Sequence, residues 1–336
     1  MDTAVDRGRC EPLTDAELRA WLAEIVQEPD GSASPRVLGR QVFKRRSDWR
    51  GLRLFEKVSI APRRGGTLVL LLKYFLPSAE MIDGARSVRS ELAVYRDLLP
   101  DGALGLPRYH GVRTVGPLSV LALEFVPGRR LKRFTDAGTW AAVADWLGRM
   151  HGCFSRRPAD LLNGSALPRL DARFYRAWAW RATECAARVS SGAGAVMERV
   201  LTRYDRVSEP LGSAAPTLLH GEFYCTNVLV DAGATIRRIA PFDWETAAVG
   251  CGALDLTYLL RQKLGLDPDR LIAAYLQGWT SSGGAPLSGT ELQAQVRRAS
   301  VHELICFVRA AAALRGAPPE KVERYAHRAD ALLEAL

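Results

Sequence analysis

A lysine inside an apolar run is the feature that most restricts how this chain can fold. Lys73 stands in LVLLLKYFL, residues 68–76, which is apolar enough to form a buried strand. Because an unpaired buried ammonium is costly, we expect a carboxylate from a neighbouring element beside it. Glu91 is suited to this role, since it lies at the edge of the apolar stripe of a helix predicted over 85–99. The alternative is that Lys73 reaches solvent from a strand end.

The 336 residues are too many for one small core, and their apolar pattern divides the chain into two parts. A capping box of Thr14 and Glu17 predicts a first helix over about 14–28. Strand-forming runs then predict antiparallel strands over 37–46, 52–60, 67–76 and 118–126. Later periodicity predicts helices over 139–154, 174–189, 197–207 and 254–264, and from about 291 and 319. We therefore expect an α+β fold, with a small sheet-based part with one key helix over 1–126 and a larger, mainly helical part over 127–336.

Two polar loops in the second part carry the oxygen atoms that a metal ion needs. Glu222 and Asn227 lie in TLLHGEFYCTNVLV, residues 217–230, between two apolar runs. A further apolar run, 236–242, ends at Asp243, sixteen residues after Asn227. Carboxylate and amide oxygens from short loops suit Mg²⁺, which takes few protein ligands and keeps phosphates and water for the others. Together with a buried lysine–glutamate pair, these groups are what phosphoryl transfer requires.

The order of these segments resembles the bilobal protein-kinase-like fold and, within it, the aminoglycoside phosphotransferase family. LVLLLKYF resembles the lysine strand, SVRSELAVYRDLL the helix whose glutamate pairs with that lysine, and LALEFVPGRRL the hinge. HGEFYCTNVLV resembles the His-Gly-Asp-x4-Asn catalytic loop, and IAPFDWETAAVGCGALDLTYLL the segment of the metal-binding aspartate. The resemblance covers residues 36–264 in the family's order.

The resemblance implies a kinase that uses ATP or GTP as donor and Mg²⁺ as cofactor, with a nucleotide-binding lobe over 1–126 and a catalytic lobe over 127–336. Lys73 would bind the α- and β-phosphates, and Glu91 would orient it. Glu222 would orient the acceptor hydroxyl, and Asn227 and Asp243 would bind the metal. Backbone groups near Glu124 and Val126 would face the nucleobase.

The sequence departs from the family pattern at three places. The catalytic aspartate is replaced by Glu222, which can serve if it reaches the hydroxyl, because little proton transfer is needed until late in the reaction. No Gly-x-Gly-x-x-Gly is present, so Ser47 and backbone amides over 46–51 would cover the phosphates. The usual Gly-Asp-Pro is Gly-Cys-Gly-Ala over 250–253, although Asp255 remains to brace the catalytic loop. The alternative is a nucleotide-binding pseudokinase scaffold with weak or no catalysis.

The positive charge of the chain is concentrated in one segment. Residues 36–64 hold ten Lys or Arg and two acidic residues, out of a net charge of +9. Such a segment can bind phosphates or an acidic partner, but no zinc-finger, RNP or helix-turn-helix pattern accompanies it, so nucleic acid is not the expected partner. Six scattered cysteines without a Cys-x-x-Cys pair, and the absence of a signal peptide or membrane-spanning run, predict a cytoplasmic protein with reduced thiols.

The charge balance also bears on the acceptor. Residues 127–255 hold seventeen basic and thirteen acidic residues, which does not favour a polycationic aminoglycoside. We expect a small neutral or acidic hydroxyl compound, such as a sugar, a nucleoside or an antibiotic-like natural product. The alternative is that the basic segment 36–64 holds an acidic peptide whose Ser or Thr is phosphorylated during natural-product maturation.

Overall fold

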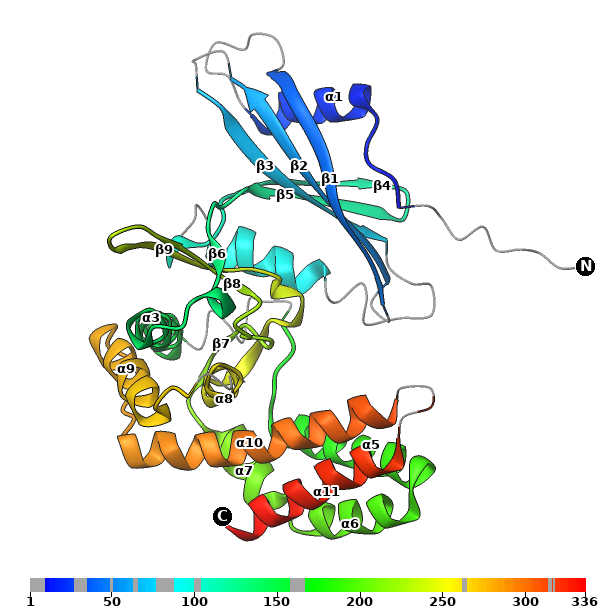
Figure 1. Cartoon of the computed structure of the whole chain (residues 1–336), viewed down its shortest axis with the longest axis vertical. Helices are drawn as coiled ribbons and strands as arrows, with labels where there is room; N and C mark the ends of the chain where they lie inside the picture. Colours follow the sequence, from blue (N-terminus) through cyan, green and yellow to red (C-terminus); the bar gives the residue numbers. More distant parts are fainter. Residues whose placement is uncertain are drawn as a thin grey trace, which may run out of the picture. The chain divides into compact units, whose positions relative to one another are not determined.

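The computed structural model describes residues 10–26, 35–48, 51–62, 66–76, 88–99, 104–157, 167–261, 265–313, 316 and 318–336 (Figure 1). They form two compact units. Unit 1 comprises the described residues of Met1–Arg129 and Leu229–Glu245, and unit 2 those of Arg130–Val228 and Thr246–Leu336. This division differs from a simple boundary after residue 126, because the chain returns to unit 1 for the segment that ends at Asp243 and Glu245.

Unit 1 is built on a five-stranded antiparallel sheet with the order β1-β2-β3-β5-β4. Its strands are β1 Arg36–Asp48, β2 Gly51–Ala61, β3 Leu68–Leu76, β4 Tyr109–Val115 and β5 Leu118–Glu124. Successive side chains of a strand point to opposite faces. In β3, Leu72 and Tyr74 belong to a buried apolar core, so Lys73 between them points to the other face.

The first helix covers the apolar face of this sheet. It is α1, Asp15–Ile25, and it begins with the predicted capping box of Thr14 and Glu17 (Figure 1). Its buried side chains Leu18, Trp21 and Leu22 share a core with those of β2 and β3. The part of the helix predicted beyond residue 26 lies outside the described residues.

The helix that carries Glu91 is described from Val88 onward, and residues 88–92 are α-helical. It then widens into a π-helical turn, η1, Ala93–Leu98, in which the Leu99 amide donates to the Val94 carbonyl at 2.8 Å. The period of 3.6 that predicted this helix therefore applies to its first turns.

Unit 2 is mainly helical. Its helices are α3 Ala137–Ser155, α5 Ala172–Val189, α6 Ser191–Thr202, α7 Asp205–Ser213, α8 Ala253–Leu260, α9 Pro268–Ser281, α10 Gly289–Ala312 and α11 Pro319–Glu334. Helix α3 packs on α9, and α10 packs on α5 and α11 (Figure 1). The close contact of α3 and α9 depends on glycine, since a Cβ at Gly148 would lie 2.0 Å from the Tyr275 carbonyl oxygen. Among the described residues, no helix has both the length and the apolar character to cross a membrane.

Two helix predictions need correction. The single helix expected over 197–207 is α6 followed by α7, with a break at Arg203 and Tyr204. Helix α9 was not predicted, although Asp267 caps it and Pro268 opens its first turn. The predicted α+β class, with an antiparallel sheet and a mainly helical second part, is confirmed.

Short strands complete the two units. In unit 2, β7 Pro216–Leu219 pairs with β10 Ala248–Cys251. A three-stranded sheet has the order β6-β8-β9, formed by β6 Arg129–Arg130, β8 Val228–Ala232 and β9 Ile236–Pro241. The catalytic loop predicted from the sequence connects β7 to β8, and the predicted metal-binding aspartate follows β9.

Candidate active site

Lys73 lies buried on β3 and forms the ion pair with Glu91 that its surroundings predict. Its Nζ is 2.7 Å from Glu91 Oε2, and its side chain is 3% exposed. Nζ is also 2.6 Å from Asp243 Oδ1 and 2.8 Å from Glu245 Oε1. Lys73 therefore does not reach solvent from a strand end, and three carboxylates compensate its charge.

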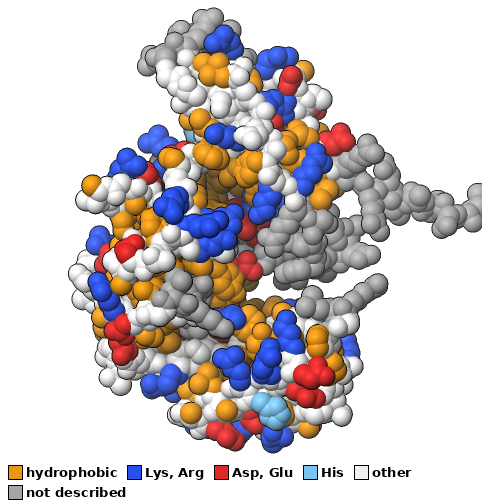
Figure 2. Space-filling model, in the orientation of Figure 1, with side chains coloured by type: hydrophobic (Ala, Val, Ile, Leu, Met, Phe, Trp, Pro, Cys, Tyr) orange, Lys and Arg blue, Asp and Glu red, His pale blue; other side chains and the backbone are white. Residues whose placement is uncertain are grey.

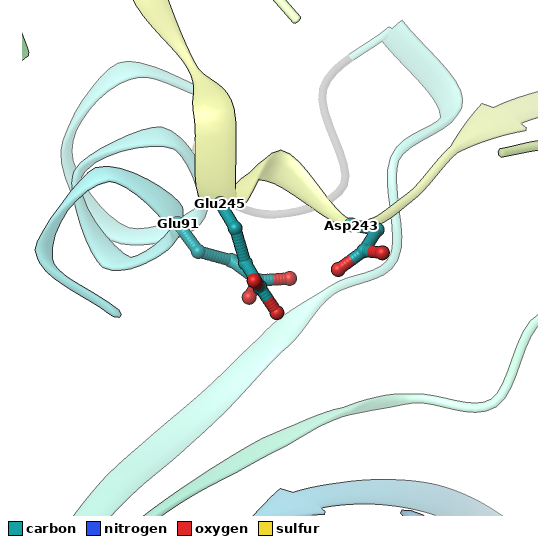
Figure 3. Close-up of side chains that lie close together, drawn as sticks. All are labelled: Glu91, Asp243 and Glu245. Carbon is teal, nitrogen blue, oxygen red and sulfur yellow. The ribbon is translucent and has the colours of Figure 1, made fainter. Parts of the chain in front are cut away.

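These three carboxylates come from two parts of the chain. Glu91 belongs to the helix that precedes η1, whereas Asp243 and Glu245 follow β9 (Figure 3). In the close-up the carboxylates of Glu91 and Glu245 lie beside each other, and Asp243 faces them (Figure 3). Asp243 has a φ of 71°, in the left-handed region where a residue other than glycine is uncommon. This backbone conformation is strained, and the ion pair with Lys73 offsets part of its cost.

The charges around Lys73 alter the pKa values of the group. Burial lowers the pKa of Lys73, but Asp243, Glu91 and Glu245 outweigh burial and raise that pKa above its usual value. Burial raises the pKa of Asp243, and the charge and hydrogen bond of Lys73 outweigh it, so this pKa lies well below its usual value. Burial, together with the charges of Glu245 and Asp243, raises the pKa of Glu91. Asp243 therefore stays ionised more firmly than Glu91 does.

The donor set fits a magnesium ion at Asp243. Glu91, Asp243 and Glu245 each offer an oxygen, and these atoms lie within 4.8 Å of one another. The Asp243 side chain is 17% exposed, whereas those of Glu91 and Glu245 are 1% exposed. Asp243 can thus bind a hydrated ion on its exposed side, as suits Mg²⁺, which keeps several water or phosphate ligands.

In unit 2, the loop after β7 is fixed by a buried aspartate. Asp255 on α8 accepts a hydrogen bond from the His220 amide at 2.6 Å and another from the Gly221 amide at 2.9 Å. His151 lies 3.3 Å from the same carboxylate and 2.8 Å from the hydroxyl of Tyr275. Asp255 therefore braces the loop as the family resemblance implies, and His151 is an interior histidine with polar partners.

Glu222 and Asn227 are positioned by hydrogen bonds within this loop. The Glu222 amide donates to His220 Nδ1 at 3.3 Å, and Asn227 Nδ2 donates to the Glu222 carbonyl at 3.1 Å. Because the nitrogen of the Asn227 amide group is bound inside the loop, its Oδ1 is the atom that suits a metal ion. Both side chains are half-buried.

The predicted hinge lies at the end of β5. Glu124 accepts hydrogen bonds from Arg238 Nη1 at 2.7 Å and Nη2 at 2.9 Å, and one from the Arg108 amide at 3.1 Å. The side chain of Glu124 therefore ties β5 to β9, and its amide donates to the Arg108 carbonyl at 2.9 Å. Val126 is buried just beyond the strand. Ser47 lies on β1 opposite Leu52, and its side chain is outside the described residues.

The structure thus brings Lys73, Glu91 and Asp243 together within unit 1, and Glu222 and Asn227 within one loop of unit 2. Two residues of this region were not expected from the sequence. Arg53 on β2 is buried and pairs with Glu245, and Arg238 on β9 binds Glu124. For Arg53, the sequence shows only a single arginine between Leu52 and Leu54 in a predicted strand. Such an arginine is as typical of a solvent-exposed strand face as of a buried ion pair.

A buried lysine paired with carboxylates in unit 1, and in unit 2 a braced His-Gly-Glu-x4-Asn loop, are features of a kinase-like phosphotransferase. The model of the Phosphotransferase enzyme family, APH, matches residues 66–291. The chain belongs to this family, and the predicted resemblance to aminoglycoside phosphotransferases is confirmed. It is accordingly a phosphotransferase that acts on a hydroxyl group.

Solved structures show the same fold over most of the chain. A protein of Ralstonia eutropha described as an aminoglycoside phosphotransferase is 13% identical, with a TM-score of 0.58 over 95% of this chain and 97% of that chain. Spectinomycin phosphotransferase, solved with ADP and spectinomycin, is 12% identical, with a TM-score of 0.53 over 97% and 99%. An ethanolamine kinase of Plasmodium vivax is 9% identical, with a TM-score of 0.51 over 95% and 89%. No curated protein matches this chain.

Proposed function

We propose that this protein transfers the γ-phosphoryl group of ATP or GTP to a hydroxyl group of a small molecule, with Mg²⁺ as cofactor. The observation that carries the proposal is the buried Lys73, 2.7 Å from Glu91 and 2.6 Å from Asp243. Phosphoryl transfer needs a cation that positions the donor phosphates and an acidic group that binds the metal.

Each residue of the site has one role in the proposed reaction. Lys73 binds the α- and β-phosphates, and Glu91 orients the ammonium. Asp243 and Asn227 Oδ1 hold the metal, which supplies positive charge that neutralises the transferring group. Glu222 orients the acceptor hydroxyl and accepts its proton late in the transfer.

The donor is a nucleoside triphosphate in this proposal. The backbone near Glu124 and Val126 would bind the base, and Ser47 with the neighbouring backbone amides would cover the phosphates. The presence of ADP in the spectinomycin phosphotransferase structure supports a nucleotide donor for this fold. The exocyclic groups of adenine and guanine differ, so competition between ATP and GTP would establish the preference.

The acceptor is proposed to be a neutral or acidic small molecule, such as a sugar, a nucleoside or an antibiotic-like natural product. The similar proteins named above include phosphotransferases for spectinomycin and ethanolamine, which supports a small acceptor. On the described part of the face in Figure 2, basic side chains are interspersed with acidic ones, and no large acidic surface for a polycation is visible. The alternative to a small-molecule acceptor is still an acidic peptide whose Ser or Thr is phosphorylated.

We also propose that the protein works in the cytoplasm. No two of its six cysteines, which all lie in the described residues, form a disulfide. Burial raises the pKa of the thiols of Cys10, Cys225, Cys251 and Cys306, as is typical of unreactive reduced cysteines.

A phosphoryl-transfer screen against sugars, nucleosides and acidic peptides, with radiolabelled ATP and Mg²⁺, tests the proposal. Once an acceptor is found, we expect Glu222→Gln to bind Mg-ATP as the wild type does and to lower kcat by about 100-fold or more. Asp243→Ala should lose Mg-ATP binding itself. If Glu222→Gln phosphorylates the true acceptor at the normal rate, its proposed role is wrong.

A further inference from the structure

Two charged residues beside Lys73 have no role in the reaction proposed above. Glu245 Oε1 lies 2.8 Å from Lys73 Nζ, and its second oxygen, Oε2, lies 2.5 Å from Arg53 Nη2. Glu245 therefore bridges the lysine of β3 and an arginine of the neighbouring strand β2. The side chains of Glu245 and Arg53 are 1% and 4% exposed, so the bridge is shielded from solvent and from salt.

The buried charges of this cluster are equal in number once Asp243 is assigned to the metal. Three carboxylates, Glu91, Asp243 and Glu245, lie with two cations, Lys73 and Arg53. If Asp243 serves the metal, two carboxylates and two cations remain in the buried region. Without Arg53, one buried carboxylate would lack compensation, which is strongly destabilising. Arg53 therefore allows a second glutamate to be buried beside Lys73.

A second glutamate also affects the orientation of the Lys73 ammonium group. In the structure, Asp243 is one of the three partners of Lys73, yet the reaction requires this aspartate for the metal. Glu91 and Glu245 would remain as partners, and they approach from different elements, the helix before η1 and the 3-10 turn η4, Trp244–Thr246 (Figure 3). Two carboxylates from separate elements restrict an ammonium group more than one carboxylate does.

We propose that Glu245 is a second positioning residue for Lys73, and that Arg53 holds Glu245 in that position. This inference rests on the proposed function, since it assigns the pair to the binding of the donor phosphates. Glu245 acts through Lys73 and does not touch the substrate. A purely structural role, in which Arg53 and Glu245 only join β2 to the segment after β9, is the alternative that the experiment must separate.

Calorimetric titration with Mg-ADP distinguishes the positioning role from the purely structural role. The titrations are made at a temperature at which the melting curve of every variant shows that it is folded. We expect Glu245→Gln and Arg53→Met each to weaken Mg-ADP binding by about 10-fold, since Lys73 loses a partner or that partner loses its support. The double variant should bind within about threefold of Glu245→Gln, because both changes remove the same interaction. Arg53→Lys, which keeps the positive charge and is the milder change, should bind within about threefold of the wild type.

The matched control is Arg96→Met, which removes an exposed ion pair with Asp97 in the same unit and should leave the affinity unchanged. Folded Glu245→Gln and Arg53→Met variants with wild-type affinity would overturn this inference and leave the proposed function intact. So would independent effects that multiply to about 100-fold in the double variant. A wild-type protein that binds no Mg-nucleotide would overturn the proposed function and this inference with it.

Discussion

Steric constraints explain why the middle residue of the His-Gly-Glu triplet is glycine. Gly221 has a φ of 81°, and a Cβ added there would lie 2.2 Å from the carbonyl oxygen of Thr246. Its amide also donates to Asp255 at 2.9 Å, so the loop cannot move away without losing this bond. The position between His220 and Glu222 therefore admits only glycine.

We predict that Gly221→Ala lowers the free energy of unfolding by about 2 kcal/mol or more, because strain and a backbone clash add together. The control is Gly116→Ala, at a φ of 56° with no atom within 4 Å of the added Cβ. This change should cost only about 1 kcal/mol, the price of the left-handed conformation. Denaturant titrations of both variants measure the difference. Equal losses would show that the contact with Thr246 is not limiting.

At the level of single residues, the sequence predicted the groups whose charge conflicts with their surroundings. Lys73 stands in an apolar run, and Glu91 lies on a helix at its edge, so a pair between them was foreseeable. The role of Glu245 could not be predicted, because the sequence around Asp243 does not show whether the side chain of Glu245 points into the interior. Arg53 also escaped prediction, since its partner lies 192 residues away along the chain.

At the level of elements, one side chain of β9 makes several polar contacts with other parts of unit 1. Arg238 Nε donates to the Gly105 carbonyl at 2.7 Å, and Nη2 donates to the Leu106 carbonyl at 2.7 Å. The same guanidinium forms the bidentate pair with Glu124 at the end of β5. Arg238 thus supports the hinge and the strand that leads to Asp243.

We predict that Arg238→Met lowers the free energy of unfolding by about 2 kcal/mol or more, because it leaves Glu124 and two carbonyl groups without a charged donor. The neighbouring Arg237 provides the control, since its pair with Asp231 is two-thirds exposed on the arginine side. Arg237→Met should change stability by less than about 0.5 kcal/mol. Thermal unfolding of the two variants decides this, and similar melting temperatures would count against the supporting role of Arg238.

The elements that sequence patterns predicted best are those with a regular period. Strands β1, β2 and β3 and helices α3, α5, α10 and α11 lie where their apolar spacing places them. The break between α6 and α7 was not predicted, because Val200, Tyr204 and Val207 are all fully buried and continue the helical spacing across it. Strand β4 was missed because its residues show no alternation of buried and exposed side chains, and β10 was missed because four residues are too few to show a period.

For the whole molecule, the two-part division followed from composition and order, but the membership of each unit did not. The return of residues 229–245 to unit 1 depends on contacts such as that of Arg238 with Glu124, 114 residues away. Local sequence patterns cannot predict contacts between residues so far apart in the chain. The acceptor is likewise not encoded in a pattern, because its specificity depends on side chains that several helices contribute.

The most direct test of the central claim is whether Mg²⁺ changes the affinity for ATP through Asp243. Calorimetric titrations of ATP into the wild type and Asp243→Asn, each with Mg²⁺ and with EDTA, measure this coupling. We predict that Mg²⁺ strengthens ATP binding by about 10-fold or more, or about 1.4 kcal/mol, in the wild type and by less than about twofold in the variant. Equal ATP affinity of the wild type with and without Mg²⁺, or a full magnesium effect in Asp243→Asn, would contradict the account.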